Sequence, residues 1–94
     1  MKLKNRGGQN YPIKCTYVRW ISSKDTITLL NAKTQKYYLL NEVASLIWQF
    51  SDGAHSVFKI IKVIESRFTG QPNSITSHVY SFLDFLKKRG LINF

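Results

Sequence analysis

A change in hydrophobic period at Asn41 constrains the fold of this chain more than any other feature of its sequence. Before Asn41, apolar residues tend to alternate with polar ones. The first run shows this alternation: Tyr11, Ile13, Cys15 and Tyr17. After Asn41, apolar residues recur at three- and four-residue spacing: Val43, Leu46, Ile47 and Phe50. A period of two predicts strands and a period near 3.6 predicts helices. Strands followed by helices indicate an α+β fold, with the helices packed on one side of an antiparallel sheet.

Three strands are expected in the first part of the chain. One lies within residues 13–21, the second covers residues 26–30 and the third covers residues 36–40, all rich in aromatic or β-branched side chains. The polar segments 22–25 and 31–35 are short enough to be turns. Short links between consecutive strands produce an antiparallel meander.

Three helices are expected in the second part of the chain. Asn41 is a favourable N-cap for the first, which the Ser51-Asp52-Gly53 turn ends. Ser56 can cap the second helix, and the segment 69–73 ends it because this segment contains glycine followed by proline.

The third helix is expected to begin after a Ser74 cap and to end at Gly90. Its apolar stripe consists of Ile75, Val79, Phe82, Leu83 and Leu86. The short apolar tail 91–94 can fold back to close the core. Since no internal repeat or boundary interrupts the pattern, residues 11–94 are expected to form a single domain.

The chain has a net charge of +9 over 94 residues, and most of it belongs to the N-terminal third. Residues 1–36 carry eight Lys or Arg and one acid, whereas residues 37–94 carry six and four. Residues 1–10 show no apolar period and contain Gly7-Gly8, which indicates a flexible basic arm. A basic surface attracts nucleic acid, anionic membrane or acidic peptide, and it also simply aids solubility, so charge alone does not choose among these.

A reducing compartment is expected from the single cysteine, Cys15, because one thiol cannot form an internal disulfide. No apolar run approaches the roughly 20 residues needed to cross a bilayer. A glycine-rich polar segment follows the basic N-terminus where a signal peptide would be apolar. A cytoplasmic location is therefore expected.

No constellation of catalytic or metal-binding residues is apparent in the sequence. His55 and His78 have no other ligand at a suitable spacing, and the five acids are scattered. Cys15 lies in an expected strand without a CxxC partner and is interpreted as a small hydrophobic residue. We therefore expect a binding protein rather than an enzyme, without metal or cofactor.

An exposed sheet edge is one feature that could bind a ligand. The third expected strand, residues 36–40, has few polar residues to prevent pairing with another chain. On the third helix, His78 and Phe85 project together beside the apolar stripe. Phe85 either forms the wall of a groove or widens the core face of the helix.

The segment from Tyr37 to Trp48, followed by Asp52-Gly53, resembles the PqqD-like family, also called RiPP recognition elements. Phe82-Leu83-x-Phe85-Leu86 leading into Gly90-Leu91-Ile92 is similar to the end of that pattern. The resemblance covers roughly residues 13–92. One departure is His78, where many relatives have Asp.

The resemblance implies a winged helix-turn-helix-like fold and a non-catalytic role. Such domains bind the leader segment of a ribosomally made precursor peptide as an extra strand beside the third strand, in a groove shared with the third helix. The partner would be a leader-cleaving cysteine protease of a lasso-peptide pathway, which is favoured, or a radical SAM maturase. The implied leader-binding residues are Tyr37, Tyr38, Leu39, Leu40, His78, Phe82, Phe85, Leu86 and Arg89.

The alternative is a winged-helix DNA-binding regulator, because the same fold class binds DNA and the chain is basic. In that case a recognition helix would enter the major groove. However, residues 74–86 contain no Arg or Lys to grip phosphates or reach bases. Nucleic acid is therefore an unlikely partner on sequence grounds.

Overall fold

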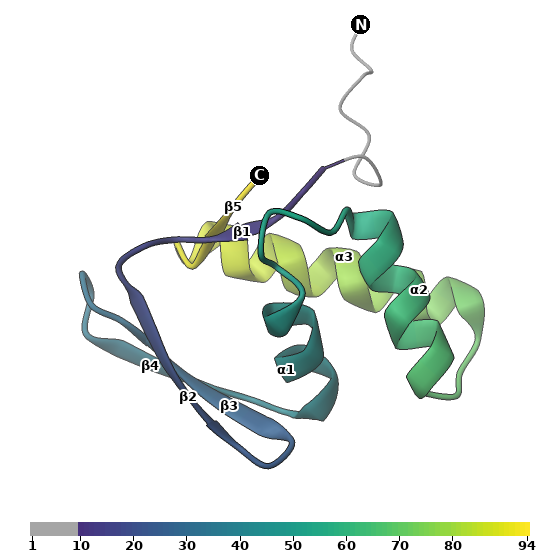
Figure 1. Cartoon of the computed structure of the whole chain (residues 1–94), viewed down its shortest axis with the longest axis horizontal. Coiled ribbons are helices and arrows are strands. Elements are labelled where there is room, and N and C mark those ends of the chain that lie inside the picture. Colours follow the sequence, from purple (N-terminus) through teal and green to yellow (C-terminus); the bar gives the residue numbers. More distant parts are fainter. Residues whose placement is uncertain (1–9) are drawn as a thin grey trace, which may run out of the picture.

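The computed structural model describes residues 10–94. Its elements are β1 (Ile13–Lys14), β2 (Val18–Ser23), β3 (Thr26–Asn31), β4 (Lys36–Leu40), α1 (Glu42–Gln49), α2 (Val57–Arg67), α3 (Pro72–Lys88) and β5 (Ile92–Asn93). Figure 1 shows the meander of β2, β3 and β4 on one side and the helices on the other. The α+β fold expected from the sequence, a three-stranded antiparallel sheet followed by three helices, is confirmed. The expected arm of residues 1–10 falls outside the described residues except for Asn10.

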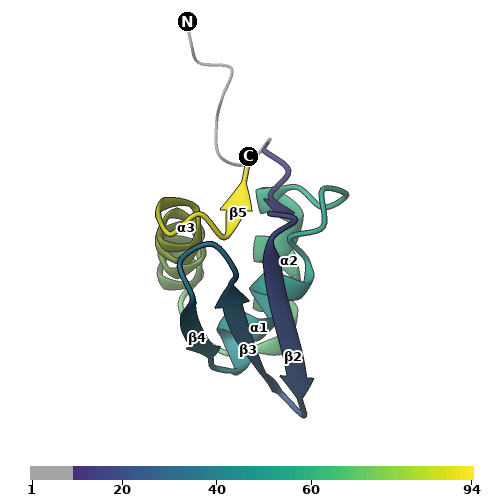
Figure 2. The ribbon, with the colours of Figure 1, turned by 90° about the vertical axis from the view of Figure 1, so that its left-hand side faces the viewer.

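The sheet has the strand order β2-β3-β4, so β2 and β4 are its edges. Leu29 of β3 lies opposite Trp20 of β2 and Tyr38 of β4, and these three side chains share the face that meets the helices. The opposite face carries the row Ile21, Thr28 and Leu39 and the row Arg19, Leu30 and Tyr37. In Figure 2, α1 and α2 lie behind the sheet, and α3 lies beyond the β4 edge.

The expected first strand, within residues 13–21, is divided in two by the structure. Its first part, β1, pairs with β5 at the end of the chain instead of joining the main sheet. The Cys15 amide donates to the Leu91 carbonyl at 3.0 Å, and the Tyr17 hydroxyl donates to the Gly90 carbonyl at 2.7 Å. The C-terminal tail folds back, as expected, and forms β5. Residues 13–15 bond to this tail and therefore do not join the meander.

The first two helices begin at the caps expected from the sequence. The Asn41 side chain accepts a hydrogen bond from the Ala44 amide, and the Ser56 hydroxyl accepts one from the Lys59 amide. The expected start of the third helix was wrong by one turn. Pro72 occupies the first turn of α3, where its missing N–H costs nothing and its fixed φ is already helical.

The core lies between the sheet and the helices and holds the third helix in place. Trp48 of α1, Leu29 of β3 and Leu86 of α3 are all fully buried in it. At the far end of α3, the Asn31 side-chain amide donates to the Arg89 carbonyl at 3.2 Å. This bond connects the β3–β4 hairpin to the end of α3, so it fixes the position of the helix beside the sheet edge.

A groove between β4 and α3

The free edge of β4 lies beside α3 without packing closely against it. The space between them is an open groove of about 540 Å³. An aromatic row forms its wall: the Tyr38 ring meets the Phe85 ring edge-on at 6.0 Å, and Phe85 stacks with Phe82 at 6.0 Å. All three aromatic side chains are half-buried, so each keeps a surface that a ligand could cover.

A second hollow, of about 480 Å³, continues the groove beyond Phe82. Residues of α1 and α3 line it: Val43, Ala44, Ile47, His78, Ser81 and Phe82. Asn41 and Ala44 line both hollows, which makes the two continuous along the molecule. The site is therefore one elongated apolar groove with two depressions.

The structure places most of the predicted site residues around this groove. Tyr38, Phe82 and Phe85 line it, His78 lies in the second hollow, and Arg89 lies over the Phe85 ring at 4.6 Å. Phe85 has both of the positions considered for it, because it lines the groove and also packs against the core.

Four other predicted residues have different surroundings. Leu86 is fully buried in the core and has no surface for a ligand. Leu40 lines the groove but is 3% exposed, so mainly its backbone is available. The side chains of Tyr37 and Leu39 belong to the outer face of the sheet, where they are 70% and 76% exposed.

The sequence analysis missed the contribution of α1 to the groove. Val43, Ala44 and Ile47 line the second hollow, whereas the stripe that contains Val43 and Ile47 was used only to predict a helix. The signal available in sequence was the small residue Ala44 within the first helix. A side chain of this size leaves space beside β4 where a larger one would fill it.

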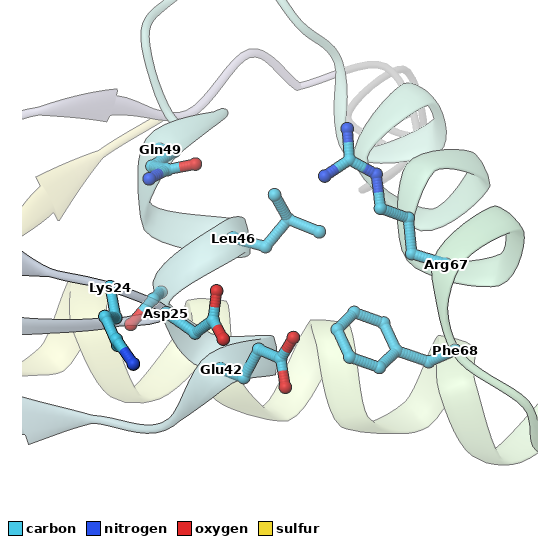
Figure 3. A pocket seen from close by; sticks show the side chains of 8 residues that line it. Lys24, Asp25, Glu42, Leu46, Gln49, Arg67 and Phe68 are labelled. Atoms are coloured by element: carbon cyan, nitrogen blue, oxygen red, sulfur yellow. The ribbon is translucent and has the colours of Figure 1, made fainter.

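A third hollow has a different chemical character. Figure 3 shows Asp25 and Glu42 on one side of it, and Arg67 and Phe68 on the other. Its volume is about 200 Å³, and it shares no lining residue with the groove. Opposite charges across an open, mostly polar hollow are readily solvated, so the apolar groove is the stronger candidate for a binding site.

The groove has the chemistry of a binding site for an extended chain. Its wall is apolar, and one side is a strand with unpaired backbone groups. Over residues 10–94, no group of three or more His, Cys, Asp or Glu is arranged to hold a metal ion. None of the helices described is both long and apolar enough to span a membrane.

Fold and groove together define a class of protein, a small α+β domain that keeps one strand edge open beside an apolar groove. Residues 27–92 match the family model of coenzyme PQQ synthesis protein D, PqqD, and the chain belongs to this family. This confirms the resemblance found in the sequence. Among curated proteins, no match to the chain was found.

Two solved structures share the fold. One is described as TbiB1 in complex with the TbiA(beta) leader peptide, with a TM-score of 0.80 and 21% identity, over 86% of this chain and 94% of that chain. The other is a lasso peptide synthetase B1 complexed with the leader peptide, with a TM-score of 0.79 and 18% identity, over 89% of this chain and 99% of that chain.

Proposed function

We propose that this protein binds the leader segment of a ribosomally made precursor peptide as a fourth strand along β4. The observation that carries the proposal is the free edge of β4 beside the aromatic wall of Tyr38, Phe85 and Phe82. Backbone hydrogen bonds to the edge supply affinity, and alternate side chains of the added strand enter the groove. A micromolar complex needs only about −8 kcal/mol, which a short strand with two filled hollows can supply.

The two structural neighbours support this proposal, because both contain a leader peptide. The second neighbour, a lasso peptide synthetase B1, also favours a lasso-peptide pathway for this protein over one that uses a radical SAM maturase. In this role the protein catalyses nothing itself and needs no cofactor. It delivers the precursor to a leader-cleaving cysteine protease in the cytoplasm, where the precursor is made.

Delivery requires a second surface, and the outer face of the sheet provides one. Ile21, Tyr37 and Leu39 project from this face, and Ile21 is 74% exposed. Large apolar side chains gathered on one exposed face are typical of a protein interface. Because Tyr37 and Leu39 also border the groove, an enzyme docked on this face would lie directly beside the bound leader.

A titration with the synthetic leader encoded beside the gene tests leader binding, with fluorescence anisotropy as the readout. We expect saturable binding that largely survives an increase from about 50 to 200 mM salt, because the groove is apolar. Phe85→Asp should weaken binding at least about tenfold, since a charge would replace the central ring of the wall. Phe58→Asp is the matched control, because Phe58 is an exposed aromatic residue on α2, outside the groove.

Circular dichroism on both variants checks that they remain folded. Equal weakening by the two substitutions would contradict the placement of the site in the groove. If the wild-type protein ignores the leader and instead binds duplex DNA with a strong salt dependence, the DNA-binding alternative is correct.

A further inference from the structure

Two cations are next to lining residues at one end of the groove: Lys36 precedes Tyr37 in β4, and Arg89 contacts Phe85. Lys36 begins β4 and shares the helix-facing side of the strand with Tyr38. Arg89 follows α3, and its guanidinium lies over the Phe85 ring at 4.6 Å. Lys36 pairs with Asn31 in the sheet, and the Asn31 side chain donates to the Arg89 carbonyl. Asn31 therefore joins the start of β4 to the end of α3, with Lys36 and Arg89 on either side of it.

These two cations are not neutralised within the described part of the chain. The ion pairs found between residues 10 and 94 involve His55, Lys62 and Lys88, and neither Lys36 nor Arg89 takes part in one. Lys87 and Lys88 lie in the last turn of α3, where cations stabilise the negative end of the helix dipole. That explanation does not extend to Lys36, which lies on a strand.

Arg89 is also held beside the groove by an aromatic contact. Its guanidinium carbon lies 4.6 Å from the centre of the Phe85 ring, and this cation–π contact restrains an otherwise exposed side chain. A restrained guanidinium loses less side-chain freedom when it forms a bidentate pair with a carboxylate.

The other end of the groove has no Lys or Arg in its lining. Asn41 and His78 line the second hollow there, whereas the Glu42 carboxylate lines the separate third hollow. The groove therefore runs from an end beside Lys36 and Arg89 to an end lined by an amide and an imidazole. Such polarity distinguishes the two directions in which a peptide can lie.

The sheet favours one of these directions. Both strand pairs of the meander are antiparallel, and antiparallel pairing is the more stable per residue. A peptide that pairs antiparallel to β4 places its N-terminal part beside Leu40 and its C-terminal part beside Lys36.

We propose that Lys36 and Arg89 form a carboxylate subsite that reads an acidic residue on the C-terminal side of the peptide's apolar anchor residues. This rests on the proposed leader binding and adds to it a direction and a second element of specificity. The groove selects apolar side chains, and the cationic end selects how the peptide lies in it.

Three synthetic peptides with the same apolar anchors test the subsite. One carries Glu on the C-terminal side of the anchors, one carries Glu on the N-terminal side, and one carries Gln at both positions. The wild-type protein should bind the first peptide about fivefold more tightly than the other two. This ratio is near the largest effect that one exposed ion pair has on affinity. The Lys36→Glu, Arg89→Glu double variant should lose this preference and should instead favour a peptide with Lys at the C-terminal position.

The matched control is the Lys59→Glu, Arg67→Glu double variant, which changes the net charge equally on α2. This variant should retain the preference for the C-terminal Glu, because α2 does not line the groove. A preference caused only by the overall charge of +9 would not depend on the position of Glu in the peptide. If the three peptides bind the wild type equally, the subsite is overturned while leader binding stands. A preference for the N-terminal Glu overturns the proposed direction. If no peptide binds, both the proposed function and the subsite fail.

Discussion

At the scale of single residues, Asp52 shows how a polar side chain fixes the turn between α1 and α2. Its carboxylate accepts a hydrogen bond from the Ala54 amide at 2.9 Å, and Nδ1 of His55 lies 3.0 Å from it. The interaction with His55 is the main cause that holds the pKa of Asp52 below its ordinary value of 3.8. The charged form of Asp52 therefore stabilises the folded state.

Replacing Asp52 by Asn should reveal this contribution in the pH dependence of stability. A lowered folded-state pKa adds stability above the unfolded pKa, and this stability disappears as the pH falls through the folded value. The difference in free energy of unfolding between the wild type and Asp52→Asn should be present at pH 5 and shrink below about pH 4. It should stay under about 1 kcal/mol, because the pair is exposed. Urea unfolding across this range measures it, and a difference that grows in acid would contradict the assignment.

Lys14 illustrates a residue whose role depends on distant partners. Its ammonium donates to the carbonyls of Gln49 at 3.3 Å and Ser51 at 3.1 Å, and lies over the Trp20 and Trp48 rings. Burial lowers the pKa of Lys14, and the Asp52 carboxylate opposes this shift. The sequence showed Lys14 only as the polar partner in an alternating strand pattern.

At the scale of elements, the end of α3 is where the chain turns back to form β5. Gly90 has a φ of +73°, and a Cβ at this position would lie 3.2 Å from the Tyr17 hydroxyl. The same hydroxyl donates to the Gly90 carbonyl. This turn therefore requires glycine for two reasons, its backbone conformation and the close approach of Tyr17.

We expect Gly90→Ala to lower the free energy of unfolding by about 1–2 kcal/mol, from left-handed strain and from the contact with Tyr17. In a Tyr17→Phe background the added cost should be smaller, because the hydroxyl that meets the new methyl group is gone. Urea denaturation of the four proteins in this cycle gives the coupling. An identical cost in both backgrounds would show that the close approach contributes nothing.

At the scale of the whole molecule, the proposed function assigns the leader and the processing enzyme to two surfaces of one sheet. The free edge of β4 faces the groove, whereas Ile21, Tyr37 and Leu39 project from the outer face. In this proposal a peptide and a second protein bind at the same time. Tyr37 and Leu39 border both surfaces, whereas Ile21 lies on the outer face alone, so Ile21 is the residue that separates delivery from leader binding.

Ile21→Asp tests that separation. Ile21 is on β2, at the opposite edge of the sheet from the groove, so leader affinity should change less than about twofold. The variant should no longer form a complex with the purified leader peptidase, because a charge would be placed in an apolar interface. Size-exclusion chromatography measures this loss. Loss of leader affinity together with peptidase binding would instead show that the two surfaces are not separate. Thr28→Asp on β3 provides a second variant of the same face.

The order and type of the three meander strands and the three helices were predictable from the sequence because they depend on local properties, whereas the pairing of β1 with β5 was not. The period of two before Asn41 and the helical period after it are visible in neighbouring residues. The caps at Asn41 and Ser56 act within three residues of themselves. Even the error at the start of α3 was local, because Pro72 can begin a helix as well as end one.

The lining of the groove was decided only by the tertiary structure. Phe85 and Leu86 are neighbours in the sequence, yet one lines the groove and the other is fully buried. The difference depends on the distance and rotation of α3 relative to β4, which contacts such as Asn31 with Arg89 set over 58 residues of chain. The helical period places Leu86 in the apolar stripe and Phe85 beside it, but no local pattern shows whether β4 leaves an open space next to Phe85. The sequence therefore determined which elements form and which family they resemble, while packing between distant segments determined which side chains remain available to a ligand.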